Sequence, residues 1–86
     1  MDQKMYRQCL REYLRDALQK SDGSNAGMSN YLMQQIEPGR FARNREEKIR
    51  ALNEVQRVFS EHRHWPVDMI FTYLGIKLEE VQGKQS

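Results

Sequence analysis

The side chains best suited to binding chemistry gather between residues 40 and 50, the most basic window of the chain. Its cations are Arg40, Arg43, Arg45, Lys48 and Arg50, and its only acids are Glu46 and Glu47. Guanidinium and ammonium groups neutralise phosphates and give nucleic-acid binding a salt-dependent affinity. Just before this window, Asn30, Gln34 and Gln35 carry amides, which match the acceptor and donor that adenine shows in the major groove. Together the two groups indicate a nucleic-acid surface.

The residue types give little support for a catalytic site, a metal site or a phosphate-binding loop. No nucleophile–base pair, carboxylate dyad or metal-ligand cluster can be assembled by spacing, so we expect no enzymatic activity, no catalytic residue, no metal and no cofactor. His62 and His64 have the spacing of a loop and no carboxylate cluster beside them. The stretch 21–27 contains glycine and serine before a helix but lacks the spacing and the lysine of a phosphate-binding loop.

Four apolar stripes at helical spacing must position these side chains. They predict helices over residues 2–20, 29–37, 44–62 and 66–74, separated by 21–27, Pro38-Gly39 and Trp65-Pro66. The expected fold is therefore all-α, a small single-domain bundle of about four helices over residues 1–81. Residues 76–81 alternate over too short a length to separate a strand from a last helical turn. Residues 82–86 are expected to form a flexible polar tail.

The predicted helix 29–37 would carry the amides. Ser29 is its expected N-cap, because the hydroxyl can accept a hydrogen bond from a backbone N–H that the first turn leaves unpaired. Met28 and Met33 could form a hydrophobic staple, and Leu32 and Ile36 continue the same apolar stripe. Pro38-Gly39 would end the helix, because proline disfavours helical geometry in the residue before it.

The first predicted helix, 2–20, has an apolar face that is wide for so small a domain. Adjacent apolar pairs recur every four residues from Met5 to Leu18, so they share one face. A face that simply points into the core is one interpretation. The other is that part of it forms the seam of a homodimer, and the residues nominated for that seam are Tyr6, Leu10, Tyr13 and Leu14.

Two segments resemble a known family. Gly27-Met28-Ser29, Met33 and Ile36-Glu37-Pro38-Gly39-Arg40 are similar to the recognition-helix half of a Cro/repressor-type (XRE-like) helix-turn-helix domain, over residues 27–41. Residues 74–81, Leu-Gly-Ile-Lys-Leu-Glu-Glu-Val, weakly resemble the segment that closes such domains. The first helix of the family's motif would fall on residues 18–25, which read Leu-Gln-Lys-Ser-Asp-Gly-Ser-Asn here.

The resemblance implies a DNA-binding transcriptional regulator that acts as a homodimer on double-stranded DNA. Helix 29–37 would lie in the major groove, and the basic connector 40–50 would hold phosphates. The residues expected near base edges are Ser29, Asn30, Tyr31, Gln34 and Gln35, and those expected on phosphates are Arg40, Arg43, Arg45 and Lys48. The alternative is a small helical protein–protein interaction module, an adaptor or inhibitor of another protein, with no DNA binding.

The totals leave both hypotheses open. The net charge of this 86-residue chain is only +2, so a nucleic-acid surface has to come from clustering of cations. One cysteine excludes an intrachain disulfide and is typical of a reducing compartment, so a cytoplasmic location is expected. No apolar run is long enough to predict a membrane span.

Overall fold

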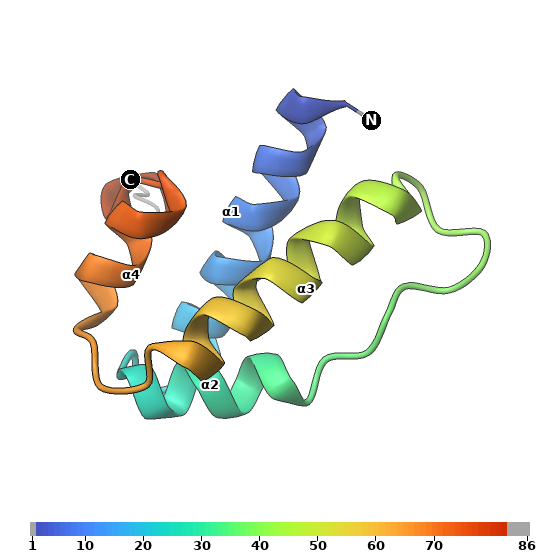
Figure 1. The fold of residues 1–86 in the computed structure, drawn as a ribbon. Coiled ribbons are helices and arrows are strands. Elements are labelled where there is room, and N and C mark those ends of the chain that lie inside the picture. The colour runs from blue at the N-terminus through green and yellow to red at the C-terminus, as the bar shows by residue number, and fades with distance from the viewer. Residues whose placement is uncertain (1, 83–86) are drawn as a thin grey trace.

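The computed structural model describes residues 2–82, and all the regular structure within that range is helical (Figure 1). The helices are α1 (Gln3–Gln19), α2 (Asn25–Met33), α3 (Arg45–Glu61), α4 (Val67–Leu74) and α5 (Leu78–Gln82). The predicted all-α class is confirmed, and α1, α3 and α4 begin and end within one residue of their expected bounds. For residues 76–81 a strand and a last helical turn were both possible, and the structure has a helical turn there, α5. Of the expected tail, Gln82 belongs to α5 and residues 83–86 lie outside the described range.

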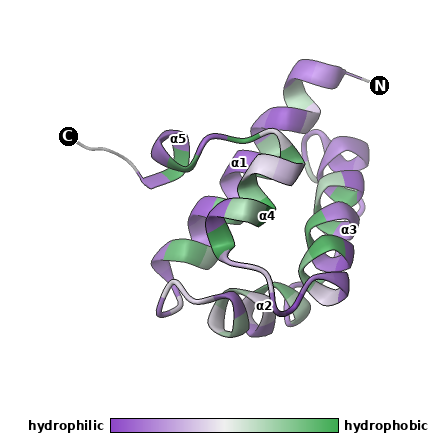
Figure 2. Cartoon of the chain, turned by 60° about the vertical axis from the view of Figure 1, so that its left-hand side comes forward, coloured by the Kyte–Doolittle hydropathy of each residue, from purple (hydrophilic) through white to green (hydrophobic). Residues whose placement is uncertain are grey.

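Helix α1 is the centre of the bundle, since α2, α3 and α5 all pack against it. The hydropathy colouring of Figure 2 places the apolar residues mostly on the sides of the helices that face one another, and these residues form the buried core. Leu14 of α1 and Phe59 of α3 are completely buried in this core. Each of these helices is amphipathic because its apolar residues return every three or four positions.

The proposed dimer seam on α1 is therefore wrong for two of its four residues. Leu10 and Leu14 are only 2% and 0% exposed, because neighbouring helices of the same chain cover them. Tyr6 and Tyr13 lie at the edge of the same face and stay partly exposed. The width of the apolar face reflects three packing partners for α1 within one chain, so a second copy is not needed to bury it.

The start predicted for α2 from the sequence is also wrong, by one helical turn. The N-cap is Ser24, whose Oγ accepts a hydrogen bond from the backbone N–H of Gly27 at 3.0 Å. The Asn25 amide donates to the carbonyls of His62 (3.1 Å) and Trp65 (2.6 Å), which ties the start of α2 to the turn between α3 and α4. Ser29 is consequently an interior residue of α2, 4% exposed, and cannot cap a helix or reach DNA.

Gly27 explains why the chain has a glycine inside this helix. The Asp22 carboxylate accepts hydrogen bonds from the backbone N–H of Ser24 (3.0 Å) and from its hydroxyl (2.6 Å), and so lies against the first turn of α2. A Cβ on residue 27 would collide with that carboxylate. The glycine thus permits a close approach within the cap of α2.

Helix α2 ends four residues earlier than expected, and a side chain of α3 binds one carbonyl in its last turn and one just beyond its end. Gln56 Nε2 donates to the carbonyl of Leu32 at 2.8 Å and to that of Gln35 at 3.2 Å. The chain leaves the helix after Met33. The expected staple does not form, since Met28 is buried while Met33 is exposed, and Ile36 is exposed as well.

Candidate interaction surface

The segment between α2 and α3, residues 34–44, is called the connector below. It contains no helix or strand, and Figure 1 shows it standing away from the helices as a long loop. Two carbonyls in its first half accept hydrogen bonds from α3: Gln56 Nε2 donates to Gln35, and Arg45 Nε donates to Pro38, both at 3.2 Å. The Arg45 guanidinium also lies 3.6 Å from the Glu37 carboxylate. The connector is thus a loop in a defined conformation.

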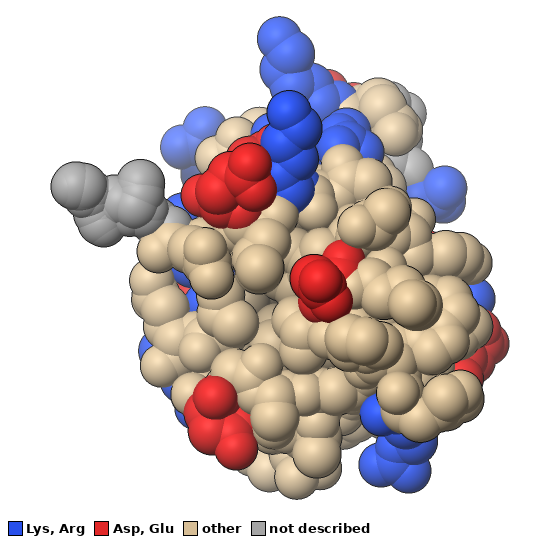
Figure 3. All heavy atoms as spheres, turned by 90° about the vertical axis from the view of Figure 1, so that its left-hand side faces the viewer, with Lys and Arg blue, Asp and Glu red and all other residues tan. Residues whose placement is uncertain are grey.

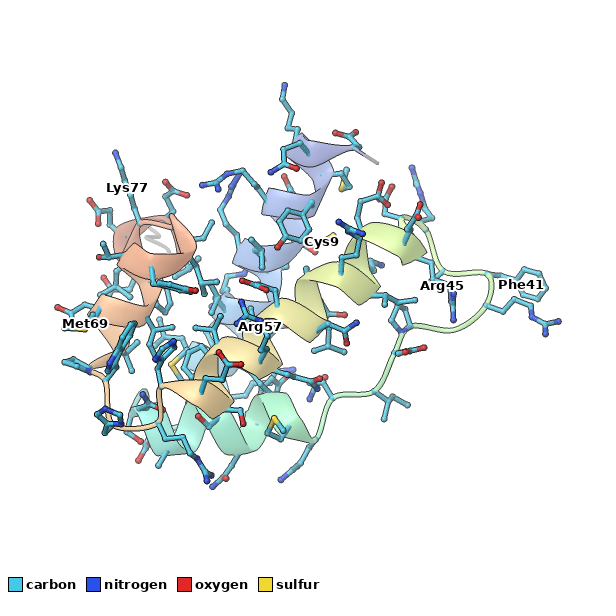
Figure 4. All side chains as sticks on the ribbon, in the orientation of Figure 1. Cys9, Phe41, Arg45, Arg57, Met69 and Lys77 are labelled. Atoms are coloured by element: carbon cyan, nitrogen blue, oxygen red, sulfur yellow. The ribbon has the colours of Figure 1, made fainter. Side chains whose placement is uncertain are left out.

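The tip of the connector is the turn 39–42, closed by a hydrogen bond from the Ala42 N–H to the Gly39 carbonyl at 3.0 Å. Its two central residues are Arg40 and Phe41. The Phe41 side chain is 90% exposed, and Figure 4 shows it at the outermost point of the loop, pointing away from the bundle. An aromatic ring that could contribute about 1.5–3 kcal/mol on burial is therefore left in water.

Phe41 is not an isolated exposed apolar residue. Ile36, 85% exposed, belongs to the same connector, and Met33, also exposed, immediately precedes it. Single exposed apolar side chains are ordinary in soluble proteins, but three of them between residues 33 and 41 make this segment a candidate interaction surface. The signal for Phe41 was present in the sequence, since it lies among arginines and belongs to none of the four apolar stripes.

The four cations expected on phosphates, Arg40 and Arg43 on the connector and Arg45 and Lys48 on α3, differ in how strongly other residues of the chain engage them. Arg40 and Arg43 are exposed and form no ion pair with any of residues 2–82. Arg45 is engaged by Glu37 and the Pro38 carbonyl, while Lys48 is partly buried beside α1. Two of the four cations expected on phosphates thus remain fully available for a partner.

A groove lies directly beside the connector, between it and α1. It has a volume of about 250 Å³, and its lining residues are Cys9, Glu12, Tyr13, Asp16, Gln35, Ile36, Pro38 and Lys48. We call it the α1–connector groove. Glu12 and Asp16 lie one helical turn apart on α1, so both carboxylates border the same side of the groove.

Two titratable side chains of the groove, Tyr13 and Cys9, have a raised pKa. Burial first, and then the neighbouring Cys9, Glu12 and Asp16, raise the pKa of the Tyr13 phenol. Burial is also the main reason why the pKa of the Cys9 thiol is raised, and Glu12 adds to the effect. Both groups remain protonated at neutral pH, so Cys9 is a packing residue, and the carboxylates of Glu12 and Asp16 are the acidic groups of the groove lining.

The remaining residues expected at base edges are partly available. Asn30 and Gln34 are exposed, whereas Tyr31 and Gln35 are partly buried, and Gln35 Nε2 donates to the Tyr31 carbonyl at 3.4 Å. Helix α2 itself contains no lysine or arginine. Two of the expected amides, on α2 and directly after it, and two of the expected arginines, on the connector, are therefore exposed, but Ser29 does not belong to this set.

A second groove, between α1 and α3, is lined by polar side chains that include two arginines. Its volume is about 350 Å³, and it is lined by Gln3, Tyr6, Arg50, Asn53, Glu54 and Arg57. The Arg57 guanidinium binds both Glu54 and Glu61 at 2.9 Å, so its charge is compensated within the helix. This pattern is typical of a solvated helix face with ion pairs between successive turns.

The face that carries α4 has fewer charged side chains than the connector and the groove between α1 and α3. Figure 3 shows it as mostly uncharged, with a few separate acidic groups. Met69 and Tyr73 are exposed on it, and Tyr73 lies edge-on to Trp65, with ring centroids 5.9 Å apart. The His62 ring stacks on Trp65 at 3.8 Å, so this imidazole packs on an aromatic ring. Met69 and Tyr73 are thus a second pair of exposed apolar side chains, on α4.

Within residues 2–82, no helix has both the length and the apolar character needed to cross a bilayer. A search for relatives found no matching protein-family model, no matching curated protein and no matching solved structure.

Proposed function

We propose that this chain is a small helical protein-interaction module, an adaptor or inhibitor that binds a partner protein through its connector. The observation that supports this most is the exposure of Phe41 on a turn that one backbone hydrogen bond closes. Because the turn is already formed, little conformational entropy is lost when the ring enters a pocket.

The composition of the connector also favours a protein partner. Phenylalanine, methionine and arginine are enriched in the centres of protein interfaces, and Met33, Arg40 and Phe41 are exposed together here. The exposed side of α2, by contrast, offers no cation to a phosphate backbone. The buried free thiol of Cys9 is consistent with a module that works in the cytoplasm.

The proposal is tested by affinity capture from the native cells with matched baits. The double variant Ile36→Ser, Phe41→Ser changes the connector, and Met69→Ser changes the α4 face in a chemically similar way. We expect a partner that the parent retains to be lost with the first variant and kept with the second. Equal retention by both variants would contradict binding through the connector.

DNA binding is the second candidate function, and one observation favours it. Asn30 and Gln34 are exposed, as are Arg40 and Arg43, so α2 and the segment that follows it offer donors for base edges and donors for phosphates. A regulator of this size gains affinity by reading two half-sites, so this proposal includes a homodimer.

Gln34 and Arg43 separate base reading from charge attraction. If DNA is the target, Gln34→Ala should cost about 1–3 kcal/mol on a selected duplex and little on a random one. Arg43→Ala should weaken both duplexes alike and lower the salt slope by about one, because a phosphate contact carries no sequence information. A salt titration of affinity on both duplexes measures this. A parent that binds neither duplex at low salt would remove the DNA candidate.

A further inference from the structure

The connector tip and the α1–connector groove have opposite properties and occur on every copy of the chain. The tip presents an aromatic ring between two free guanidinium groups, those of Arg40 and Arg43. The groove is lined by Tyr13 and by the carboxylates of Glu12 and Asp16, which we call its rim. We propose that the connector tip of one copy docks into the α1–connector groove of a second copy, and that the reciprocal contact forms at the same time. This inference rests on the proposed protein-binding function and names the partner as the chain itself.

The groove has the size that the ring requires. A buried apolar cavity of roughly 150 Å³ is enough to bind benzene. The α1–connector groove, at about 250 Å³, therefore has room for the side chain of Phe41 and part of its backbone. The ring cannot use the groove of its own chain in this conformation, because the turn 39–42 directs it away from the bundle (Figure 4).

The charges favour the same pairing. Arg40 and Arg43 would approach Glu12 and Asp16 of the second copy, while Lys48 lies in the lining of the same groove and reduces its net charge to −1. A two-fold interface is self-complementary, so each of these contacts occurs twice. The dimer would thus use Tyr13 of the four residues first nominated, and would leave Leu10 and Leu14 in the core.

Charge reversal gives a test that only this pairing passes. The tip-reversed variant carries Arg40→Glu and Arg43→Glu, and the rim-reversed variant carries Glu12→Lys and Asp16→Lys. Each variant alone places like charges in both halves of the dimer, so both should sediment as monomers. An equimolar mixture restores opposite charges in both halves, because each tip then meets the rim of the other variant. Sedimentation equilibrium should therefore show a dimer for the parent, monomers for each variant and a heterodimer for the mixture.

Phe41→Ala is the independent variant, since it changes no charge. Truncating an interface anchor typically costs at least tenfold in affinity, and the ring occurs twice in the dimer, so its dissociation constant should rise about a hundredfold. A parent that stays monomeric up to about 1 mM overturns the dimer, as does a parent dimer that Phe41→Ala leaves unchanged. Neither result bears on a different partner protein, which affinity capture with the connector variant decides separately.

Discussion

Replacing Phe59 by alanine is expected to lower the free energy of unfolding by about 3–5 kcal/mol. Its ring is completely buried on α3, so the substitution removes apolar contacts and leaves a cavity. A domain of this size has only about 5–15 kcal/mol of stability, and such a loss brings it close to unfolding. Urea denaturation followed by circular dichroism measures the change.

Phe41→Ala is the matched control, because the same atoms are removed from a ring that is almost fully exposed. Its effect on the unfolding free energy should stay within about 0.5 kcal/mol. A large loss of stability for Phe41→Ala in the monomer would mean that the ring packs within its own chain. The connector would then not be a free binding surface.

Met28→Ala is expected to lower the unfolding free energy by about 2–5 kcal/mol, whereas Met33→Ala should cost less than about 0.5 kcal/mol. Met28 is completely buried in α2 and Met33 is exposed at its end, so the pair reports the rotational position of the helix. Comparable losses for both would contradict the observed position and favour the staple expected from sequence. Thermal unfolding of the two variants decides between them.

The long elements of the fold could be predicted because their signals are local. The stripes of α1 and α3 recur over four or more turns, and Gly75 closes α4 with a positive φ of 75°. Such a residue in the left-handed region favours glycine, which marks the end of a helix in the sequence itself.

Helix α2 could not be placed from the sequence because both of its ends depend on other segments. Its start is tied by Asn25 to the carbonyls of His62 and Trp65, which lie about forty residues away. Its end is fixed by the amide of Gln56. Ser24 and Ser29 are both acceptable N-caps by type, so only these distant hydrogen bonds choose between them.

The charges of the candidate surface could be predicted from the sequence, whereas the exposure of Phe41 could not. The arginines of the connector stand out in the sequence as a cluster of one charge. Phe41 lies outside the four stripes in the sequence, but its exposure followed only from the structure, in which the chain leaves α2 early and the turn 39–42 directs the ring outward. The groove on α1 could not be found at all from sequence, because its lining comes from three separate segments.

The most direct test of the central claim, that the connector is a protein-binding surface, is photo-crosslinking in the native cells. A benzophenone side chain is placed at position 41, and a control chain carries it at the exposed Ser60 of α3. We expect position 41 to give a discrete protein adduct, with either a second copy or another protein, and position 60 to give none. Adducts with nucleic acid alone, or no adduct from position 41, would contradict the claim.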